Sequence, residues 1–223
     1  MHGIVLLAAG SGSRMGNQTN DKILEKIGNS NAFRMCLLAF TKIQQITSIV
    51  VVFRDQEQME ELQDESNQIT TLDESNTIYV KGGEQRSDSV TNGLNTLPES
   101  CKFAHIHDCA RPLIRRETIV KMIEEVEKSI PIAVARPATN TIRKRISGST
   151  LFHTETLQRN QLWEMETPQS APLSWFREGY AKAKEMNISI TDDMHAIELL
   201  SKEMILLEPG YPNPKITHGH DLK

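Results

Sequence analysis

Residues 3–22 read GIVLLAAGSGSRMGNQTNDK, an apolar run that passes directly into a glycine-rich loop. A continuous apolar run such as Gly3–Ala9 is typical of a strand that is covered on both faces of a mainly parallel sheet. The glycines that follow let the backbone turn sharply and bring its N–H groups close to phosphate oxygens. Because ligands bind at the carboxyl ends of the strands in such sheets, the loop is a candidate phosphate-binding site.

The loop follows neither of the two common glycine patterns for nucleotides. A P-loop requires Gly-Lys-Ser/Thr, and the dinucleotide fingerprint requires a third glycine where this chain has Met15. Arg14 and Lys22 instead bring positive charge, as a guanidinium that can bind phosphate bidentately and an ammonium that acts as a mobile point charge. From these residues alone, a phosphate-binding loop and an ordinary strand-to-helix turn with incidental charges both remain open.

Short apolar runs and amphipathic stretches alternate along the rest of the chain. Strands are expected at Gly3–Ala9, Ser48–Phe53, Thr77–Val80, Phe103–Asp108, Pro131–Ala135 and Met204–Leu207. Helical spacing is expected over Asn31–Ile43 and Arg116–Ser129, and a further helix is expected to begin after Thr191 as its N-cap. The alternation predicts an α/β fold with an open, mainly parallel sheet covered by helices on both faces.

One segment interrupts this alternation. Residues 141–167 contain Gly148, alternating polar residues and two possible short strands. We interpret the segment as a protruding β-arm within a single domain that spans residues 1–223. An arm that meets another subunit and a simple surface hairpin both remain open at this point.

The composition is that of an ordinary globular protein, with 38% hydrophobic and 24% charged residues among 223. No apolar run approaches the roughly 20 residues of a membrane span, and the N-terminal stretch lacks the basic leader of a secretory signal. The three cysteines form no metal or disulfide framework, which favours a reducing, cytoplasmic location. The net charge of -4 argues against nucleic acid as a partner.

Four later segments narrow the interpretation of the glycine loop at residues 8–22. They read GGEQRSDSV at 82–90, HDCARP at 107–112, TPQ at 167–169 and KITHGHDL at 215–222. In this order, the five segments resemble the 2-C-methyl-D-erythritol 4-phosphate cytidylyltransferases, a family of nucleotidyltransferases with a Rossmann-like domain. The resemblance covers nearly the whole chain.

The resemblance implies a reaction and its partners. The chain would join CTP to 2-C-methyl-D-erythritol 4-phosphate, release pyrophosphate and use Mg²⁺, in non-mevalonate isoprenoid biosynthesis. Members of the family are commonly homodimers in which an arm of each subunit reaches the site of the other, and residues 141–167 lie where that arm is expected.

The resemblance also implies roles for individual residues. Those implied to act in catalysis are Arg14, Lys22, Arg159 and Lys215. Those implied to bind the nucleotide are Ala8, Ala9, Gly10, Gly12, Gly82, Gly83, Arg86, Ser89, Asp108 and Arg111. Thr141, Arg159 and Thr167 would face the polyol phosphate, and Asp108 is also the candidate ligand of the metal.

Two other functions and several structural roles stay open. Ribitol 5-phosphate cytidylyltransferases share most of these segments, and a non-catalytic nucleotide-binding regulatory protein could keep the fold. Asp108 could cap a loop, while Arg86 and Arg111 could be surface charges. We expect His107 and Cys109 to be packed residues, and not a ligand or a nucleophile.

Several positions depart from the family pattern. Asp21 and Ile23 flank Lys22 where proline and glutamine or alanine are usual, Asn140 replaces an aspartate, and Pro214 precedes Lys215. An acid beside Lys22 is expected to weaken its attraction for phosphate.

Overall fold

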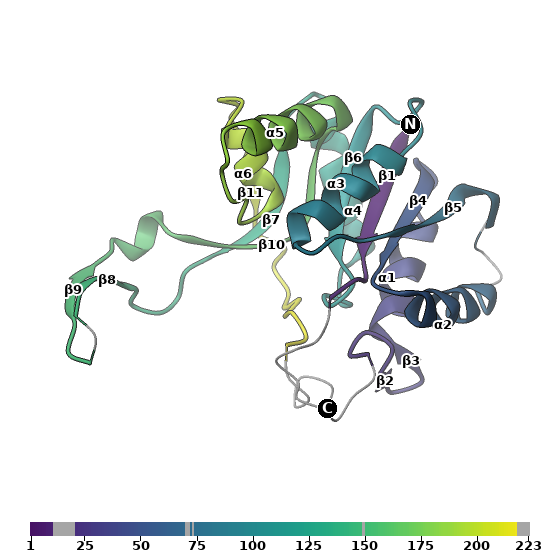
Figure 1. Ribbon diagram of the computed structural model, residues 1–223, viewed down its shortest axis with the longest axis horizontal. Coiled ribbons are helices and arrows are strands. Elements are labelled where there is room, and N and C mark those ends of the chain that lie inside the picture. The colour runs from purple at the N-terminus through teal and green to yellow at the C-terminus, as the bar shows by residue number, and fades with distance from the viewer. Residues whose placement is uncertain (11–20, 70–71, 73, 149, 218–223) are drawn as a thin grey trace.

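The computed structural model describes residues 1–10, 21–69, 72, 74–148 and 150–217, and its centre is a seven-stranded sheet with helices on both faces (Figure 1). The strand order is β11-β7-β10-β6-β1-β4-β5. The strands are β1 (His2–Leu7), β4 (Ile46–Phe53), β5 (Thr77–Lys81), β6 (Phe103–Asp108), β7 (Ile132–Pro137), β10 (Trp163–Pro172) and β11 (Ile205–Leu207). All neighbours pair in parallel except β10, which runs antiparallel to both β6 and β7.

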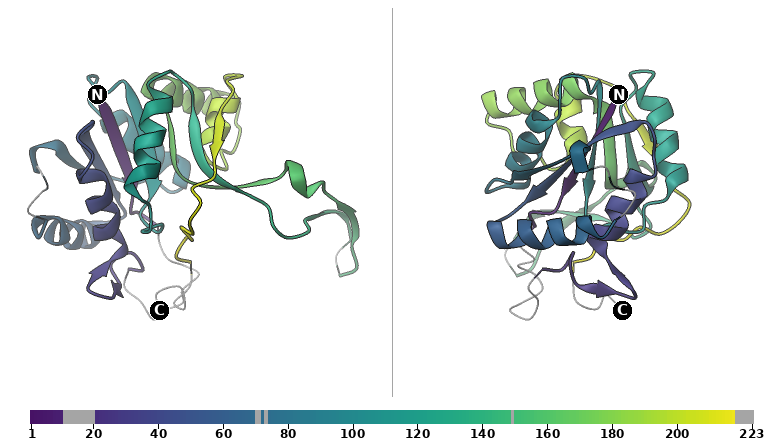
Figure 2. Two further views of the ribbon diagram at one scale, coloured as in Figure 1. Left: turned by 180° about the vertical axis from the view of Figure 1, so that it is seen from behind. Right: turned by 90° about the vertical axis from the view of Figure 1, so that its right-hand side faces the viewer.

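The central strands are buried on both faces because their alternate side chains enter two different cores. On β1, Ile4 and Leu6 pack with α1 (Ala32–Thr41), α2 (Gln56–Asn67) and α4 (Arg116–Val126), whereas Val5 packs with α3 (Arg86–Thr96), α5 (Leu173–Glu185) and α6 (Asp193–Glu198). Figure 2 shows the two helical layers on either side of the sheet. This two-sided burial explains why the strands read as continuous apolar runs.

The predicted fold class is confirmed, whereas the predicted start of the last helix is not. Asn31 caps α1 by accepting a hydrogen bond from the Arg34 N–H at 2.8 Å, as expected for the start of that helix. The prediction of Thr191 as the N-cap of the last helix is wrong. Asp192 is the cap and accepts from the His195 N–H at 3.0 Å, because its carboxylate reaches the third amide of the helix.

Residues 138–162 leave the sheet and carry a separate two-stranded hairpin, β8 (Arg143–Ser147) with β9 (His153–Thr156). The hairpin projects away from the helix-covered sheet (Figure 1). The chain then returns as β10, which joins the central sheet from Trp163, so the last residues of the range 141–167 lie inside the main sheet. The strand had not been predicted because Pro168 and polar residues interrupt its pattern, and its register shifts between Met165 and Gln169.

No helix among the described residues combines the length and the apolar composition that a membrane span requires. The remaining short elements are β2 (Lys26–Ile27), β3 (Ser30–Asn31) and the 3-10 turns η2 (Glu74–Asn76) and η3 (Arg159–Gln161).

A buried histidine pair lies on two neighbouring strands of the sheet, with His2 at the start of β1 and His105 in β6. The Nε2 atom of His105 is 3.1 Å from Nδ1 of His2, and His105 Nδ1 is 2.7 Å from the Ser170 hydroxyl. Burial, together with the neighbouring His2, lowers the pKa of His105 from 6.5 to about 3. The folded chain therefore holds this imidazole neutral where the unfolded chain would protonate it.

We expect the free energy of unfolding to fall by about 2 kcal/mol between about pH 7 and pH 5 through His105 alone. Below pH 6.5 the unfolded state binds more protons at this residue than the folded state does, so stability is lost as the pH falls toward 3. Urea unfolding of the protein and of His105→Gln at both pH values measures this difference. Equal pH dependence in the two proteins would show that His105 does not contribute.

Candidate functional site

A cavity of about 490 Å³ opens at the carboxyl ends of β1, β4, β5 and β6. Nine of the residues predicted for the site line it: Ala8, Ala9, Gly10, Lys22, Gly83, Arg86, Ser89, Asp108 and Lys215. Segments as distant in sequence as residues 8 and 215 therefore meet in one place. That place is where an open α/β sheet binds ligands.

Asp108 ends β6 and is the anionic centre of the cavity. Its Oδ1 accepts from Nε and a terminal nitrogen of Arg86 at 3.3 and 3.2 Å, and its Oδ2 accepts from the ammonium of Lys215. Burial alone would raise the pKa of the Asp108 carboxyl, but Arg86 and Lys215 hold that pKa well below its usual range. Asp108 is therefore ionised at neutral pH and keeps two cations in the cavity.

Arg86, the first residue of α3, is held by a second carboxylate. Its guanidinium donates two hydrogen bonds of 2.8 Å to Asp193, one to each oxygen. Asp193 is completely buried at the start of α6 and also accepts from the Tyr180 hydroxyl at 2.6 Å. This bidentate pairing fixes the orientation of the guanidinium, whose other edge faces Asp108 and the cavity.

The glycines at 82 and 83 are required by close approach. A Cβ on Gly82 would lie 2.7 Å from the Ser89 hydroxyl and 2.9 Å from the Ala9 Cβ, and one on Gly83 would lie 2.2 Å from the Asp88 Cβ. The Gly83 N–H donates to the Ser89 hydroxyl at 3.1 Å, which closes the turn before α3. A larger residue at position 82 would push this turn away from Ala9 at the end of β1, and one at position 83 would push it away from the first turn of α3.

Asp21 anchors the chain just before Lys22. Its carboxylate accepts from the Ile23 N–H at 3.2 Å, from Arg54 at 3.2 Å and from the Gln58 amide, which also donates to the Ala8 carbonyl at 2.9 Å. Burial raises the pKa of Asp21, and these donors oppose that rise. The acid beside Lys22 thus ties the segment to the end of β1.

Thr167 and His107 support Asp108 from behind. The Thr167 hydroxyl accepts from the Asp108 N–H at 3.1 Å and lies 3.1 Å from Nδ1 of His107, whose Nε2 lies 3.1 Å from the Arg111 carbonyl. Burial lowers the pKa of His107 to about 4, so its ring is neutral. We assign the ring proton to Nε2, because the carbonyl can only accept, and the Thr167 hydroxyl then donates to Nδ1.

Known proteins match this chain over nearly its whole length. The family model for 2-C-methyl-D-erythritol 4-phosphate cytidylyltransferase matches residues 2–223. The chain belongs to this cytidylyltransferase family. Proteins of that name from Prochlorococcus marinus subsp. pastoris and Clostridioides difficile are 32% and 31% identical to it, with 100% of this chain covered in both and 96% and 91% of the relatives covered.

Two solved structures share the fold of this cytidylyltransferase family member. The 4-diphosphocytidyl-2C-methyl-D-erythritol synthase of Anaerococcus prevotii superposes with a TM-score of 0.84 at 22% identity, covering 100% of this chain and 92% of its own. The 2-C-methyl-D-erythritol 4-phosphate cytidylyltransferase of Francisella tularensis has a TM-score of 0.78 at 24% identity and covers 99% and 96%.

Some residues that the family resemblance implies lie away from the cavity. Arg111 donates to the Asn213 carbonyl at 3.0 Å and does not line the cavity, while Gly82 lies just behind it. Thr141 and Arg159 are on the arm, and Arg159 donates to the Thr139 carbonyl at 2.8 Å. Gly12 and Arg14 lie outside the described residues.

The expectations for His107 and Cys109 are confirmed, since both side chains are fully buried. Burial also raises the pKa of the Cys109 thiol well above its ordinary value. Cys109 is therefore a packed residue of the cytidylyltransferase core and not a nucleophile.

Sequence reasoning missed Arg54 and the partner of Arg86. Arg54 follows β4 and lines the cavity, and its place directly after an apolar strand was the available signal. From the sequence, Asp193 reads only as an acid in the first turn of a helix. Nothing in the local sequence indicates that its carboxylate meets Arg86, which is 107 residues away.

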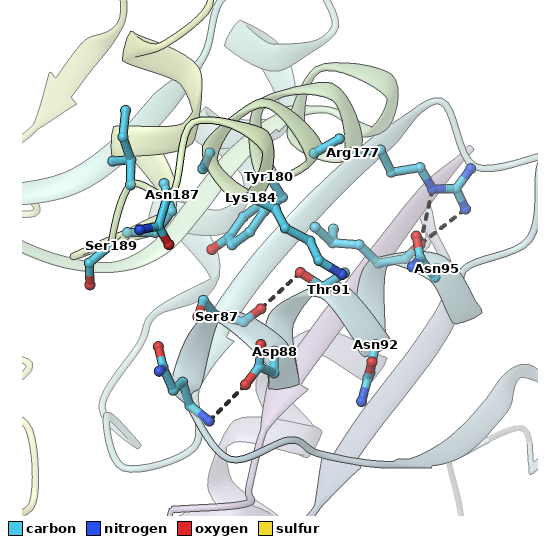
Figure 3. Close-up of a pocket in the computed structure, with 16 residues that line it drawn as sticks. Ser87, Asp88, Thr91, Asn92, Asn95, Arg177, Tyr180, Lys184, Asn187 and Ser189 are labelled. Atoms are coloured by element: carbon cyan, nitrogen blue, oxygen red, sulfur yellow. Dashed lines mark hydrogen bonds between the residues drawn. The ribbon is translucent and has the colours of Figure 1, made fainter.

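A second, larger cavity of about 650 Å³ lies between α3 and α5 (Figure 3). It contains none of the predicted site residues. Its Arg177 donates to the Leu94 and Leu97 carbonyls at 3.0 Å and so caps the end of α3. Four of the charged residues predicted for the site line the smaller cavity instead, namely Lys22, Arg86, Asp108 and Lys215.

Proposed function

We propose that the protein transfers the cytidylyl group of CTP to 2-C-methyl-D-erythritol 4-phosphate and releases pyrophosphate, as a step of non-mevalonate isoprenoid biosynthesis. The observation that carries the proposal is the convergence of Lys22, Arg86, Asp108 and Lys215 on one cavity at the strand ends of a family member. The names of the relatives support the same substrate.

The reaction requires cations more than it requires a base. The nucleophile is a phosphate monoester with a second pKa of about 6, which is mostly dianionic at neutral pH. The obstacle is the approach of one anion to another, in line with the leaving pyrophosphate. Lys22 and Lys215 enter the cavity from opposite ends of the chain and supply positive charge for this step.

The cytosine base would be read by the segment between Gly83 and Ser89. Gly83, Glu84 and Gln85 line the cavity beside Ser89, and the close turn brings their backbone groups to its wall. Backbone N–H and C=O groups can pair with the exocyclic amine and the neighbouring acceptors of cytosine.

Mg²⁺ fits this site as a partner of the triphosphate. The described residues contain no group of three acidic, histidine or cysteine side chains that could hold a metal, and Asp108 is the one carboxylate among the predicted site residues that line the cavity. Mg²⁺ is commonly held by one or two carboxylates together with substrate phosphates, so Asp108 and the phosphates of CTP would suffice. When bound, the ion would neutralise phosphate charge.

We propose that the arm completes the site of a second subunit in a homodimer. Thr141 and Arg159 extend away from the cavity of their own chain, and Ile146, Leu151 and Phe152 on the hairpin are exposed by 63%, 88% and 49%. Exposed apolar side chains on a projecting hairpin favour a protein contact. We further propose a cytoplasmic protein that acts on small molecules and binds neither nucleic acid nor membranes.

One assay tests the reaction. The protein is incubated with Mg²⁺, each of the four nucleoside triphosphates in turn, and either 2-C-methyl-D-erythritol 4-phosphate or ribitol 5-phosphate, and pyrophosphate release is followed. We expect release only with CTP and the methylerythritol phosphate. Release with ribitol 5-phosphate alone would reassign the substrate, and CTP binding without any release would indicate a regulatory protein.

A further inference from the structure

The segment that carries Lys215 has no secondary structure of its own. Residues 208–217 follow β11 and contain neither helix nor strand. The position of Lys215 in the cavity is therefore set by the contacts that hold this segment against the rest of the chain. A residue that makes one of those contacts can therefore affect the site without lining the cavity.

The segment is fastened to the loop that follows β6. The Ile216 N–H donates to the Ala110 carbonyl at 2.8 Å, and the Asn213 side-chain oxygen accepts from the Leu113 N–H at 2.9 Å. The Tyr211 hydroxyl accepts from the Arg115 N–H at 2.9 Å. Lys215 is thus bracketed by Asn213 and Ile216, whose bonds fix the backbone on both sides of it.

Two arginines hold the same segment by its carbonyl groups. Arg111 donates to the Asn213 carbonyl at 3.0 Å, and Arg136 donates to the Tyr211 carbonyl. Both guanidinium groups converge on one carboxylate oxygen of Glu166, at 3.7 Å for Arg111 and 2.6 Å for Arg136. Glu166 is therefore the common anchor of the two donors that hold the segment.

Glu166 is buried, with 7% of its surface exposed, and it does not line the cavity. It lies directly before Thr167, where the register of β10 shifts against β7. Burial lowers the pKa of Arg111, the charge of Glu166 opposes that change, and the charge of Arg136 adds to it. Without the carboxylate, two cations would face each other at a buried position, which is unfavourable.

We propose that Glu166 is a positioning residue, whose carboxylate holds Arg111 and Arg136 on the Tyr211–Asn213 backbone and thereby places Lys215 at Asp108. The inference rests on the proposed function for its effect on turnover. Its structural part stands on its own, because the contacts from Glu166 to the segment do not involve a substrate.

The kinetic test is the isosteric variant Glu166→Gln. We expect kcat to fall by about 10- to 100-fold, the size of effect that a displaced reacting group produces, with little change in KM for CTP. In a Lys215→Ala background the same substitution should have almost no further effect on kcat, because Glu166 acts through Lys215. Equal losses in both backgrounds would overturn the proposal. Glu178→Gln, at an exposed position on α5, is the matched control.

Hydrogen exchange tests the placement without any reaction. In Glu166→Gln, the amides of Leu113, Arg115 and Ile216, whose hydrogen bonds fasten this segment, should exchange faster, whereas those of β1 and β6 should not change. Unchanged exchange of the Leu113, Arg115 and Ile216 amides would refute the placement, even if turnover fell. Faster exchange there, in a protein that has no cytidylyltransferase activity at all, would keep the placement and reject the proposed function instead.

Discussion

Replacing Lys215 with alanine is expected to lower the turnover of CTP and 2-C-methyl-D-erythritol 4-phosphate by about 10²- to 10³-fold, or about 3–4 kcal/mol in barrier. The ammonium of Lys215 lies in the cavity on Asp108, and the proposed function places it beside the α-phosphate of CTP. Charge moves onto the phosphates in the transition state, so a cation at this point stabilises the transition state more than the bound substrates. Steady-state pyrophosphate release measures the loss.

The fold should tolerate this change, because Asp108 keeps the two contacts from Arg86 that are 3.2 and 3.3 Å long. The thermal midpoint of Lys215→Ala should therefore stay close to that of the parent protein. Lys121→Ala, at an exposed position on α4, serves as the control for removal of a positive charge. Turnover of Lys215→Ala within a few-fold of the parent value would show that this lysine does not act on the α-phosphate.

The layout of the sheet could be predicted because its strands are buried on both faces. Val50–Val52 and Ile4–Leu6 read as strands without alternation, and each is followed by a loop with glycine or charge. Since parallel strands place their carboxyl ends at one edge, the sequence also indicated where those loops would meet. Gly10 and Asp108 follow this rule, whereas Lys215 was indicated only by the family's motif.

The rest of the site depends on contacts that no local pattern encodes. Asp193 reads as a first-turn acid, yet folding buries it completely against Arg86 and Tyr180. Arg111 has the motif of a ligand-binding residue, yet its guanidinium is used to hold the Asn213 carbonyl. The role of each side chain depends on which residue from a distant part of the chain folds against it. A single sequence does not show which residue that is.

The pair of Arg86 and Asp193 is expected to be strongly asymmetric in its effect on stability. Arg86→Ala should lower the free energy of unfolding by about 3–5 kcal/mol, because it leaves a buried carboxylate without its cation. The Asp193 side chain has no exposed surface, and after the substitution its carboxylate would still accept the hydrogen bond of the neutral Tyr180 hydroxyl but would face no cation among the described residues. Denaturant unfolding at neutral pH measures the change.

Asp193→Asn should cost clearly less, because 34% of the Arg86 side chain is exposed and its guanidinium also pairs with Asp108. Water and Asp108 can therefore replace part of the hydrogen bonding and negative charge that Asp193 supplied to the Arg86 guanidinium. The double variant Arg86→Met with Asp193→Asn should recover much of the stability that Arg86→Ala loses, since no uncompensated charge then remains buried. Equal losses in the two single variants, with no recovery in the double variant, would mean that side-chain packing and not charge sets the stability at this point. The orientation of the Arg86 guanidinium beside the cavity would then not be due to its ion pair with Asp193.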